Sequence, residues 1–305
     1  MWLRFVRTTL IGISLLTVIV FSAIAAHAYL RYRSITPPAT NSDCCSLPSA
    51  ELPGVAAVQI AAPDQTALAC WYTPSHNRAA VIVLHGEGGD RSAMLPHMAI
   101  LARHGYGVLA CDRRAHGASD GALRSWGWLE VGDVGAMVDY LAQRGDVDQG
   151  RVGIFGFSMG AQVALRASAA YPALRAVVAD GAVPATSADL TPAASAAAWP
   201  RSAVDWLDNW FVDRMLERAT AMAAPAPMAQ ALGQRSQPLL LIATGQDGHG
   251  RELRQNQWFH TLAAPPKALW ELPDVGHGEG LARRAAEYER RVIALYDAAL
   301  LGETP

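Results

Sequence analysis

The hydrophobic positions of the chain form short continuous runs separated by stretches of mixed polarity. The continuous runs, which are typical of strands buried on both faces, lie at residues 79–84, 107–111, 151–155, 174–179, 238–243 and 268–272. The intervening stretches at residues 93–104, 130–144, 161–170 and 281–301 predict helices, and residues 55–60 and 67–72 predict an antiparallel pair at a sheet edge. Strands that alternate with helices predict an α/β fold, with a mostly parallel central sheet covered by helices on both faces.

The N-terminal segment has a different pattern. Residues 9–30 contain no charged side chain and are flanked by arginines on both sides. As a helix they would rise about 33 Å, enough to cross the hydrocarbon core of a bilayer. We therefore predict residues 1–33 to be a single-pass transmembrane anchor with its N-terminus inside and the rest of the chain extracytoplasmic. The alternative is a cleaved signal peptide, because Ala26-His27-Ala28 resembles a cleavage site, and the product would then be secreted or periplasmic.

Three further regions follow from composition. Residues 34–53 are rich in proline and serine and predict a linker. Residues 54–305 predict one folded domain, whose regular alternation is interrupted by an insertion at residues 182–237. Within the insertion, residues 202–220 place apolar side chains on one helical face. This helix has two interpretations, a helix packed on the core or a cap that lines a substrate pocket.

The strongest chemical motif is Gly156-Phe157-Ser158-Met159-Gly160. It follows a predicted buried strand directly and precedes a predicted helix. Glycines on both sides of Ser158 allow a sharp turn and a close approach of helix to strand. That turn exposes the serine Oγ beside a helix N-terminus, whose dipole favours a developing oxyanion. Ser158 is therefore the predicted nucleophile.

A serine hydroxyl needs a neutral imidazole as base and a carboxylate that orients the imidazole. We predict His277 as the base and Asp247 as the acid, because both follow late strands and the loops after parallel strands gather at one sheet edge. The chain order Ser158, Asp247, His277 is the order expected for this kind of turn. His249 is the alternative base, and Asp180 is the alternative acid.

Two backbone N–H groups should bind the oxyanion. One is that of Met159, directly after the nucleophile, and the other is that of Glu87 in a glycine-rich loop after an early strand. The carboxylate of Glu87 would oppose an oxyanion, so we expect this side chain to point away from it. We expect His85 and His116 to shape turns, and Asp112 to form a buried ion pair.

Charge and cysteine content narrow the remaining classes. The formal net charge of -2 gives no basic face for nucleic acid. The four cysteines lack the spacing of a zinc site, and no motif indicates a metal or cofactor. Two interpretations of the cysteines stay open, a disulfide from Cys44 or Cys45 to Cys70, or four unpaired thiols.

Several of these motifs together carry a family resemblance, and they lie at residues 68–72, 83–91, 110–119, 156–160 and 276–278. The chain resembles the α/β-hydrolase superfamily, in particular its serine-aminopeptidase-like branch of lysophospholipase- and esterase-like enzymes with an N-terminal membrane segment. In that family the third stretch usually reads Asp-x-Arg-Gly-His-Gly-x-Ser, whereas Ala115 replaces the first glycine here. The resemblance implies the fold and the triad, but its members include esterases, lipases, thioesterases and peptidases.

The functional hypothesis is a serine hydrolase that is carboxylesterase- or lipase-like. It would cleave an ester or other acyl bond of a small-molecule or lipid-like substrate through an acyl-Ser158 intermediate. One alternative class is a non-catalytic binding protein of the same fold. Another is an acyltransferase or peptidase that uses the same triad.

Overall fold

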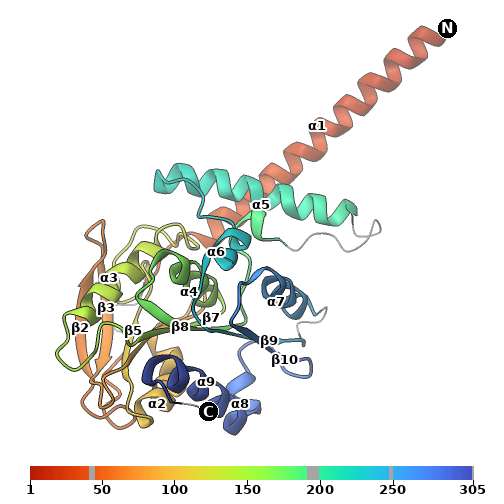
Figure 1. Ribbon diagram of the computed structural model, residues 1–305. Coiled ribbons are helices and arrows are strands. Elements are labelled where there is room, and N and C mark those ends of the chain that lie inside the picture. Colours follow the sequence, from red (N-terminus) through yellow and green to blue (C-terminus); the bar gives the residue numbers. More distant parts are fainter. Residues whose placement is uncertain (41–44, 191–198, 247–249, 304–305) are drawn as a thin grey trace.

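The computed structural model describes residues 1–40, 45–190, 199–246 and 250–303, and is built on a sheet in the strand order β10-β9-β8-β7-β4-β5-β3-β2 (Figure 1). The strands are β2 Ala56–Ala61, β3 Ala67–Thr73, β4 Ala80–Leu84, β5 Gly107–Cys111, β7 Val152–Phe157, β8 Leu174–Asp180, β9 Leu239–Thr244 and β10 Lys267–Leu272. From β10 to β5 all neighbours are parallel, and β3 and β2 add an antiparallel edge. The predicted mostly parallel α/β sheet is confirmed.

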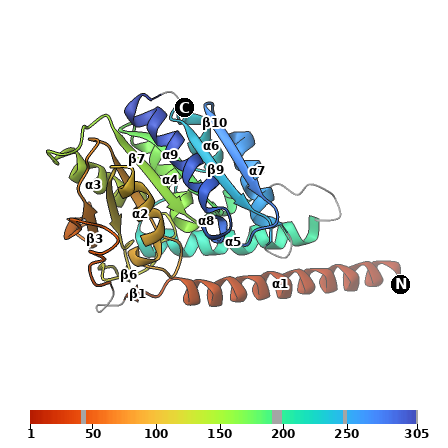
Figure 2. The same ribbon diagram turned by 90° about the horizontal axis from the view of Figure 1, so that it is seen from below.

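Helices cover both faces of the sheet, because its central strands are apolar on both sides. The helices are α2 Leu95–Arg103, α3 Glu130–Ala142, α4 Met159–Ala170, α5 Trp199–Thr220, α6 Met228–Gln234, α7 Arg251–Leu262, α8 Gly280–Arg283 and α9 Ala285–Tyr296. Side chains of α3, α4, α6 and α7 form one core cluster with the sheet, and those of α2 and α9 form the other. Figure 2 shows α2 and α9 on the side nearer the viewer.

The C-terminal region departs from the expected single helix at residues 281–301. It is divided into α8, α9 and a π-helical turn at Asp297–Leu301. The break lies at Arg284, whose backbone angles of φ -135° and ψ 40° are not helical. The helix α6 was not predicted because it has only seven residues, and α7 was not predicted because it buries the polar Gln255 and Asn256 beside Phe259, which weakens the apolar period.

The N-terminal helix α1 runs from Trp2 to Ile35 (Figure 1). Among the described residues, its segment Arg4–Ile35 is long and apolar enough to cross a membrane, and none of its most apolar window is buried against the rest of the chain. A signal sequence near an N-terminus would have the same length and composition. Both predicted interpretations of this segment therefore remain.

The insertion helix α5 lies against the C-terminal half of α1 (Figures 1 and 2). The rings of Phe21 and Phe211 meet edge to face with centroids 5.0 Å apart. The carboxylate of Asp208 lies 2.8 Å from Nδ1 of His27 and 3.1 Å from Nε of Arg31. The helix predicted either to pack on the core or to cap the site thus also packs on the N-terminal helix.

The chain after α1 is bound to the α/β domain. Strand β1, Ala39–Thr40, pairs in parallel with β6, His116–Gly117. The Ala39 N–H also donates to the carbonyl oxygen of Ala115 at 2.8 Å. The first part of the segment predicted to be a linker, residues 34–53, is therefore ordered against the domain.

The predicted link from Cys44 or Cys45 to Cys70 is wrong, and so is the alternative of four unpaired thiols. Cys70 forms a disulfide with Cys111. The reason is strand register, since Cys70 on β3 lies directly opposite Cys111 on the antiparallel neighbour β5. Cys45 is also disulfide-bonded, and Cys44 lies outside the described residues.

Candidate active site

Ser158 occupies a strained turn between β7 and α4. Its backbone angles are φ 54° and ψ -114°, a conformation that residues other than glycine rarely adopt. The turn is held by a hydrogen bond of 2.7 Å from the Ser158 N–H to the carbonyl oxygen of Asp180 at the end of β8. The predicted strand–turn–helix setting of this serine is thus present.

The two glycines of the motif are required by close backbone contacts. A Cβ on Gly156 would collide with the carbonyl group of Gly160, and a Cβ on Gly160 would collide with the carbonyl group of Leu84. The second contact brings the start of α4 directly against the end of β4. The sequence therefore forces the turn and also places it beside the loop that follows β4.

His277 lies between Ser158 and a carboxylate. Its Nε2 is 3.0 Å from the Ser158 Oγ, and its Nδ1 is 2.7 Å from Oε2 of Glu252. With the proton on Nδ1, the ring donates to Glu252 and accepts from the serine hydroxyl, as a general base requires. Glu252 is 7% exposed, and it also accepts hydrogen bonds from the N–H and hydroxyl of Thr244.

Contacts of its ring fix where the His277 side chain lies. The ring of Phe157 stacks on it with centroids 4.9 Å apart. On another side, a Cβ on Gly181 would lie only 2.8 Å from Cε1 of His277, so a larger residue there would displace the ring. Even so, the side chain is 39% exposed and can meet a substrate.

The structure brings together two of the three predicted triad residues and adds one that was missed. Ser158 and His277 are in contact, whereas the predicted acid Asp247 and the alternative base His249 lie outside the described residues. Glu252 was missed because α7 was not predicted. The available signal was an acidic residue in the first turn of a helix that follows a late strand.

The alternative acid, Asp180, has another partner. Its carboxylate accepts a hydrogen bond of 2.6 Å from the hydroxyl of Tyr288 on α9. Burial raises the pKa of Asp180 to about 7, and the nearby Glu252 carboxylate acts in the same direction, against the Tyr288 hydrogen bond and the charge of His277. The carboxylate at Nδ1 of His277 is therefore that of Glu252, whereas the Asp180 carboxylate pairs with Tyr288.

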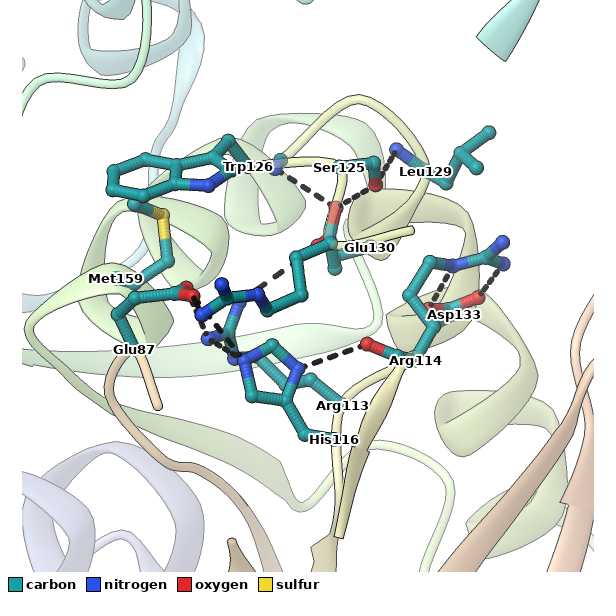
Figure 3. Close-up of polar contacts among 12 residues, drawn as sticks. Glu87, Arg113, Arg114, His116, Ser125, Trp126, Leu129, Glu130, Asp133 and Met159 are labelled. Carbon is teal, nitrogen blue, oxygen red and sulfur yellow. Dashed lines mark hydrogen bonds and ion pairs between the residues drawn. The ribbon is translucent and has the colours of Figure 1, made fainter. Parts of the chain in front are cut away.

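The glycine-rich loop after β4 lies directly beside Ser158. A Cβ on Gly86 would lie 3.2 Å from the Cβ of Ser158. The next residue, Glu87, turns its carboxylate toward Arg113 and His116, as expected (Figure 3). Burial alone would raise the pKa of Glu87, but the hydrogen bond with His116 and the charge of Arg113 lower it to about 2.

The two backbone N–H groups predicted to bind an oxyanion are those of Glu87 and Met159. Within the described part of the chain, the N–H groups of Glu87 and Met159 donate to no protein acceptor. The Met159 side chain lies between Glu87 and the ring of Trp126 (Figure 3). Its sulfur accepts from the amide of Gln162 at 3.0 Å, which fixes the start of α4.

The buried histidines and Asp112 have structural contacts. His85 Nε2 accepts from the backbone N–H of Arg113 at 2.9 Å. Asp112 forms the predicted buried ion pair, and its partner is Arg91. Cys45, Asp90 and Asp112 lie close enough to share a cation, but the Arg91 pair and the disulfide of Cys45 use the donors that a cation would need.

Comparison with known sequences agrees with this architecture. The sequence profile described as the alpha/beta hydrolase family matches residues 81–291. The chain is 30% identical over 236 residues to "Uncharacterized protein Rv2307c" of Mycobacterium tuberculosis, covering 76% of this chain and 75% of the relative. It is 27% identical over 241 residues to "Uncharacterized protein YfhR" of Escherichia coli K12, covering 76% and 77%.

Solved structures show the same fold. The esterase Pf2001 of Pyrococcus furiosus superposes with a TM-score of 0.68 at 25% identity, covering 87% of this chain and 97% of its own. The esterase EaEST of Exiguobacterium antarcticum superposes with a TM-score of 0.57 at 17% identity, a likeness of fold alone. The predicted α/β-hydrolase fold is therefore confirmed.

Proposed function

Because the chain belongs to the alpha/beta hydrolase family, we propose that it is a serine hydrolase that cleaves an ester or other acyl bond through an acyl-Ser158 intermediate. The observation that carries this proposal is the position of His277, whose two ring nitrogens contact the Ser158 Oγ and the Glu252 carboxylate. That arrangement meets the geometric requirement for an activated serine.

The proposed reaction has two stages. His277 accepts the hydroxyl proton as the Ser158 Oγ attacks the acyl carbon, and the oxyanion forms beside the N–H groups of Glu87 and Met159. His277 then donates the proton to the departing alkoxide or amine, which leaves an acyl-serine. Water, deprotonated by the same imidazole, attacks the acyl carbon. The bond to the Ser158 Oγ then breaks, the imidazolium returns the proton to this oxygen, and the acid is released.

We propose two carboxylates as partners of His277. Glu252 is supported by its hydrogen bond to Nδ1 and by its own fixation on Thr244. Asp247 is supported by its place in the chain, between the nucleophile and the base in the loop after β9. A carboxylate at Nδ1 holds the required tautomer and stabilises the imidazolium that forms during attack.

The N-terminal helix supports a membrane setting for the hydrolase. We propose that residues 1–33 anchor the chain and that residues 54–305, with the insertion at 182–237, form the catalytic domain on the extracytoplasmic side. The Cys70–Cys111 disulfide supports this side, because disulfides persist in oxidising compartments. Cleavage after residue 28 would instead release a periplasmic or secreted enzyme.

The fold implies a small-molecule substrate, and we propose a carboxylic ester with an apolar or lipid-like acyl group. The likeness to the Pyrococcus furiosus esterase supports ester cleavage. An apolar acyl group is supported by the insertion helix α5, which leaves the side chains of Val204 and Trp206 exposed.

The test is labelling by a fluorophosphonate probe together with hydrolysis of p-nitrophenyl esters of increasing acyl length. We expect the full-length protein in detergent to react with the probe and to cleave at least one ester. Ser158→Ala should lose both activities and keep its thermal unfolding midpoint, whereas Ser49→Ala, in an exposed turn, should change neither. Probe labelling that persists in Ser158→Ala would refute the assignment.

A further inference from the structure

The side chain of Arg124 binds the end of α1 and the segment that follows it. Its Nε donates to the carbonyl oxygen of Pro37 at 2.6 Å, and one terminal nitrogen donates to that of Ser34 at 3.2 Å. The backbone N–H of Arg124 donates to the carbonyl oxygen of Thr36 at 2.9 Å. Arg124 thus donates hydrogen bonds to carbonyl groups at and just after the C-terminal end of α1. A cation at this end also complements the helix dipole.

The other terminal nitrogen of Arg124 reaches the loop beside the nucleophile. It donates to Oε1 of Glu87 at 2.5 Å, while Arg113 donates to Oε2 of the same carboxylate at 3.0 Å. The side chains of Arg124 and Arg113 are 14% and 2% exposed, so both contacts are partly buried. The Glu87 carboxylate is fixed from both sides, and its own backbone N–H is a proposed oxyanion donor.

We propose that Arg124 is a positioning residue for catalysis, because it joins the Glu87 loop to the carbonyl groups of residues 34–37. The base of the N-terminal helix is then part of the machinery that aims the oxyanion donor. This inference rests on the proposed function, since it assigns a support to the oxyanion site of that reaction.

The chemistry of the contact requires arginine. Three nitrogens of one guanidinium serve three oxygens that lie in different directions, on Pro37, Ser34 and Glu87. A lysine ammonium is a compact charge and cannot span these acceptors. A role as a simple ion pair would tolerate lysine, whereas a positioning role would not.

The first experiment compares Arg124→Gln and Arg124→Lys in the full-length protein in detergent. Complete loss of an oxyanion donor costs about 10²–10³-fold in kcat, so displacement of the Glu87 loop should cost about 10-fold or more. We expect KM to change by less than about threefold, since the donor acts mainly in the transition state. The affinity of an alkylboronic acid, which forms a tetrahedral adduct on the serine, should fall by the same factor as kcat.

The matched control is Arg103→Gln, which breaks an exposed ion pair with Glu289 between α2 and α9 and should leave kcat unchanged. Unchanged kcat and boronate affinity in Arg124→Gln, or full rescue by Arg124→Lys, would overturn the inference. Failure of the wild-type protein to hydrolyse any ester would instead reject the proposed function, so the two failures are distinguishable.

A second experiment tests the helix side and uses Arg124→Gln as its reference. Insertion of Gly-Ser-Gly-Ser between Ile35 and Thr36 interrupts the run of carbonyl groups, whereas the same insertion between Ser49 and Ala50 leaves it intact. The first insertion should lower kcat about as much as Arg124→Gln, and combining the two should add little, because both act on one contact. Equal kcat in the two insertion variants, or fully additive losses, would overturn the link to the helix.

Discussion

The two sides of Ser158 are built differently. On the side of the proposed oxyanion loop, Arg113, His116 and Glu130 are almost completely buried, and Arg113 joins the other two by a hydrogen bond and an ion pair (Figure 3). On the side of the base, His277 is 39% exposed and is held by Glu252 and the ring of Phe157. The donors are therefore set during folding, whereas the base stays open to substrate.

This difference has a physical reason. Oxyanion stabilisation depends on dipoles that are fixed before reaction, and a buried charged network fixes them because breaking it would leave unpaired charges. The imidazole must pass a proton to the leaving group and then accept one from water, so it needs access to both. We therefore expect changes on the base side to lower turnover at constant stability, and changes on the oxyanion side to lower stability first.

The largest expected effect on turnover is that of His277→Gln. Removal of the base from a serine triad costs about 10⁴-fold or more in kcat. Because the ring is partly exposed, the free energy of unfolding should change by less than about 1 kcal/mol. Stopped assays of ester cleavage and urea unfolding measure the two quantities. A variant that unfolds much more easily than wild type would contradict the contrast between the sides.

The next largest loss of turnover is expected at the two proposed carboxylate partners of His277. Loss of the acid at Nδ1 costs about 10²–10⁴-fold in kcat, because the wrong tautomer becomes populated. We expect Glu252→Gln to fall in this range and the double variant with Asp247→Asn to lose more than either single variant. Steady-state kinetics of the two single variants and the double variant measure how much each carboxylate contributes. Wild-type kcat in Glu252→Gln would reject its assignment, and wild-type kcat in Asp247→Asn would reject the sequence-based one.

On the oxyanion side, the expected effect of Glu130→Ala is mainly on folding. The Glu130 carboxylate accepts from the Ser125 hydroxyl and the Gly127 N–H, and it lies 3.7 Å from a nitrogen of Arg113. Its removal leaves these buried donors unpaired and should cost about 3 kcal/mol in the free energy of unfolding. Urea titration measures the loss, and kcat of the folded fraction should stay within about tenfold of wild type. Glu130→Gln, which keeps one acceptor, should lose less.

The smallest effect on turnover is expected from Asp180→Asn. Asp180 is buried at the end of β8. Burial raises the pKa of Asp180 to about 7, so between about pH 4 and 7 the folded protein keeps a proton that the unfolded chain has released. The free energy of unfolding should therefore decrease as pH rises through this window, and Asp180→Asn should remove that decrease. Thermal unfolding at a series of pH values tests this. An unchanged pH dependence in the variant would show that Asp180 does not carry it.

The sequence predicted those parts of the site that depend on local chain geometry. The glycines around Ser158 and the buried strand before it specify the turn by themselves, and His277 follows from its place after the last strand. Glu252 could not be predicted because its role depends on a helix with little periodic signal. The Cys70–Cys111 pair required knowing that β5 is a neighbour of β3.

Arg124 shows a second limit of prediction. Its partners Ser34 and Glu87 are distant in sequence and contribute a backbone oxygen and a carboxylate, groups that no motif distinguishes. Only the folded chain brings a loop, a helix end and a strand end together around one guanidinium. Long-range contacts of this kind are set by topology and not by local pattern.

The short pairing of Ala39–Thr40 with His116–Gly117 has a consequence for how far the enzyme can reach. A free tether of residues 34–53 would let the catalytic domain wander over roughly 25 Å from its attachment point. Because the chain pairs with the domain only a few residues after the helix, this freedom of movement is lost. An anchored molecule would work at one height and one tilt above the bilayer, and would sample its substrates by lateral diffusion in two dimensions.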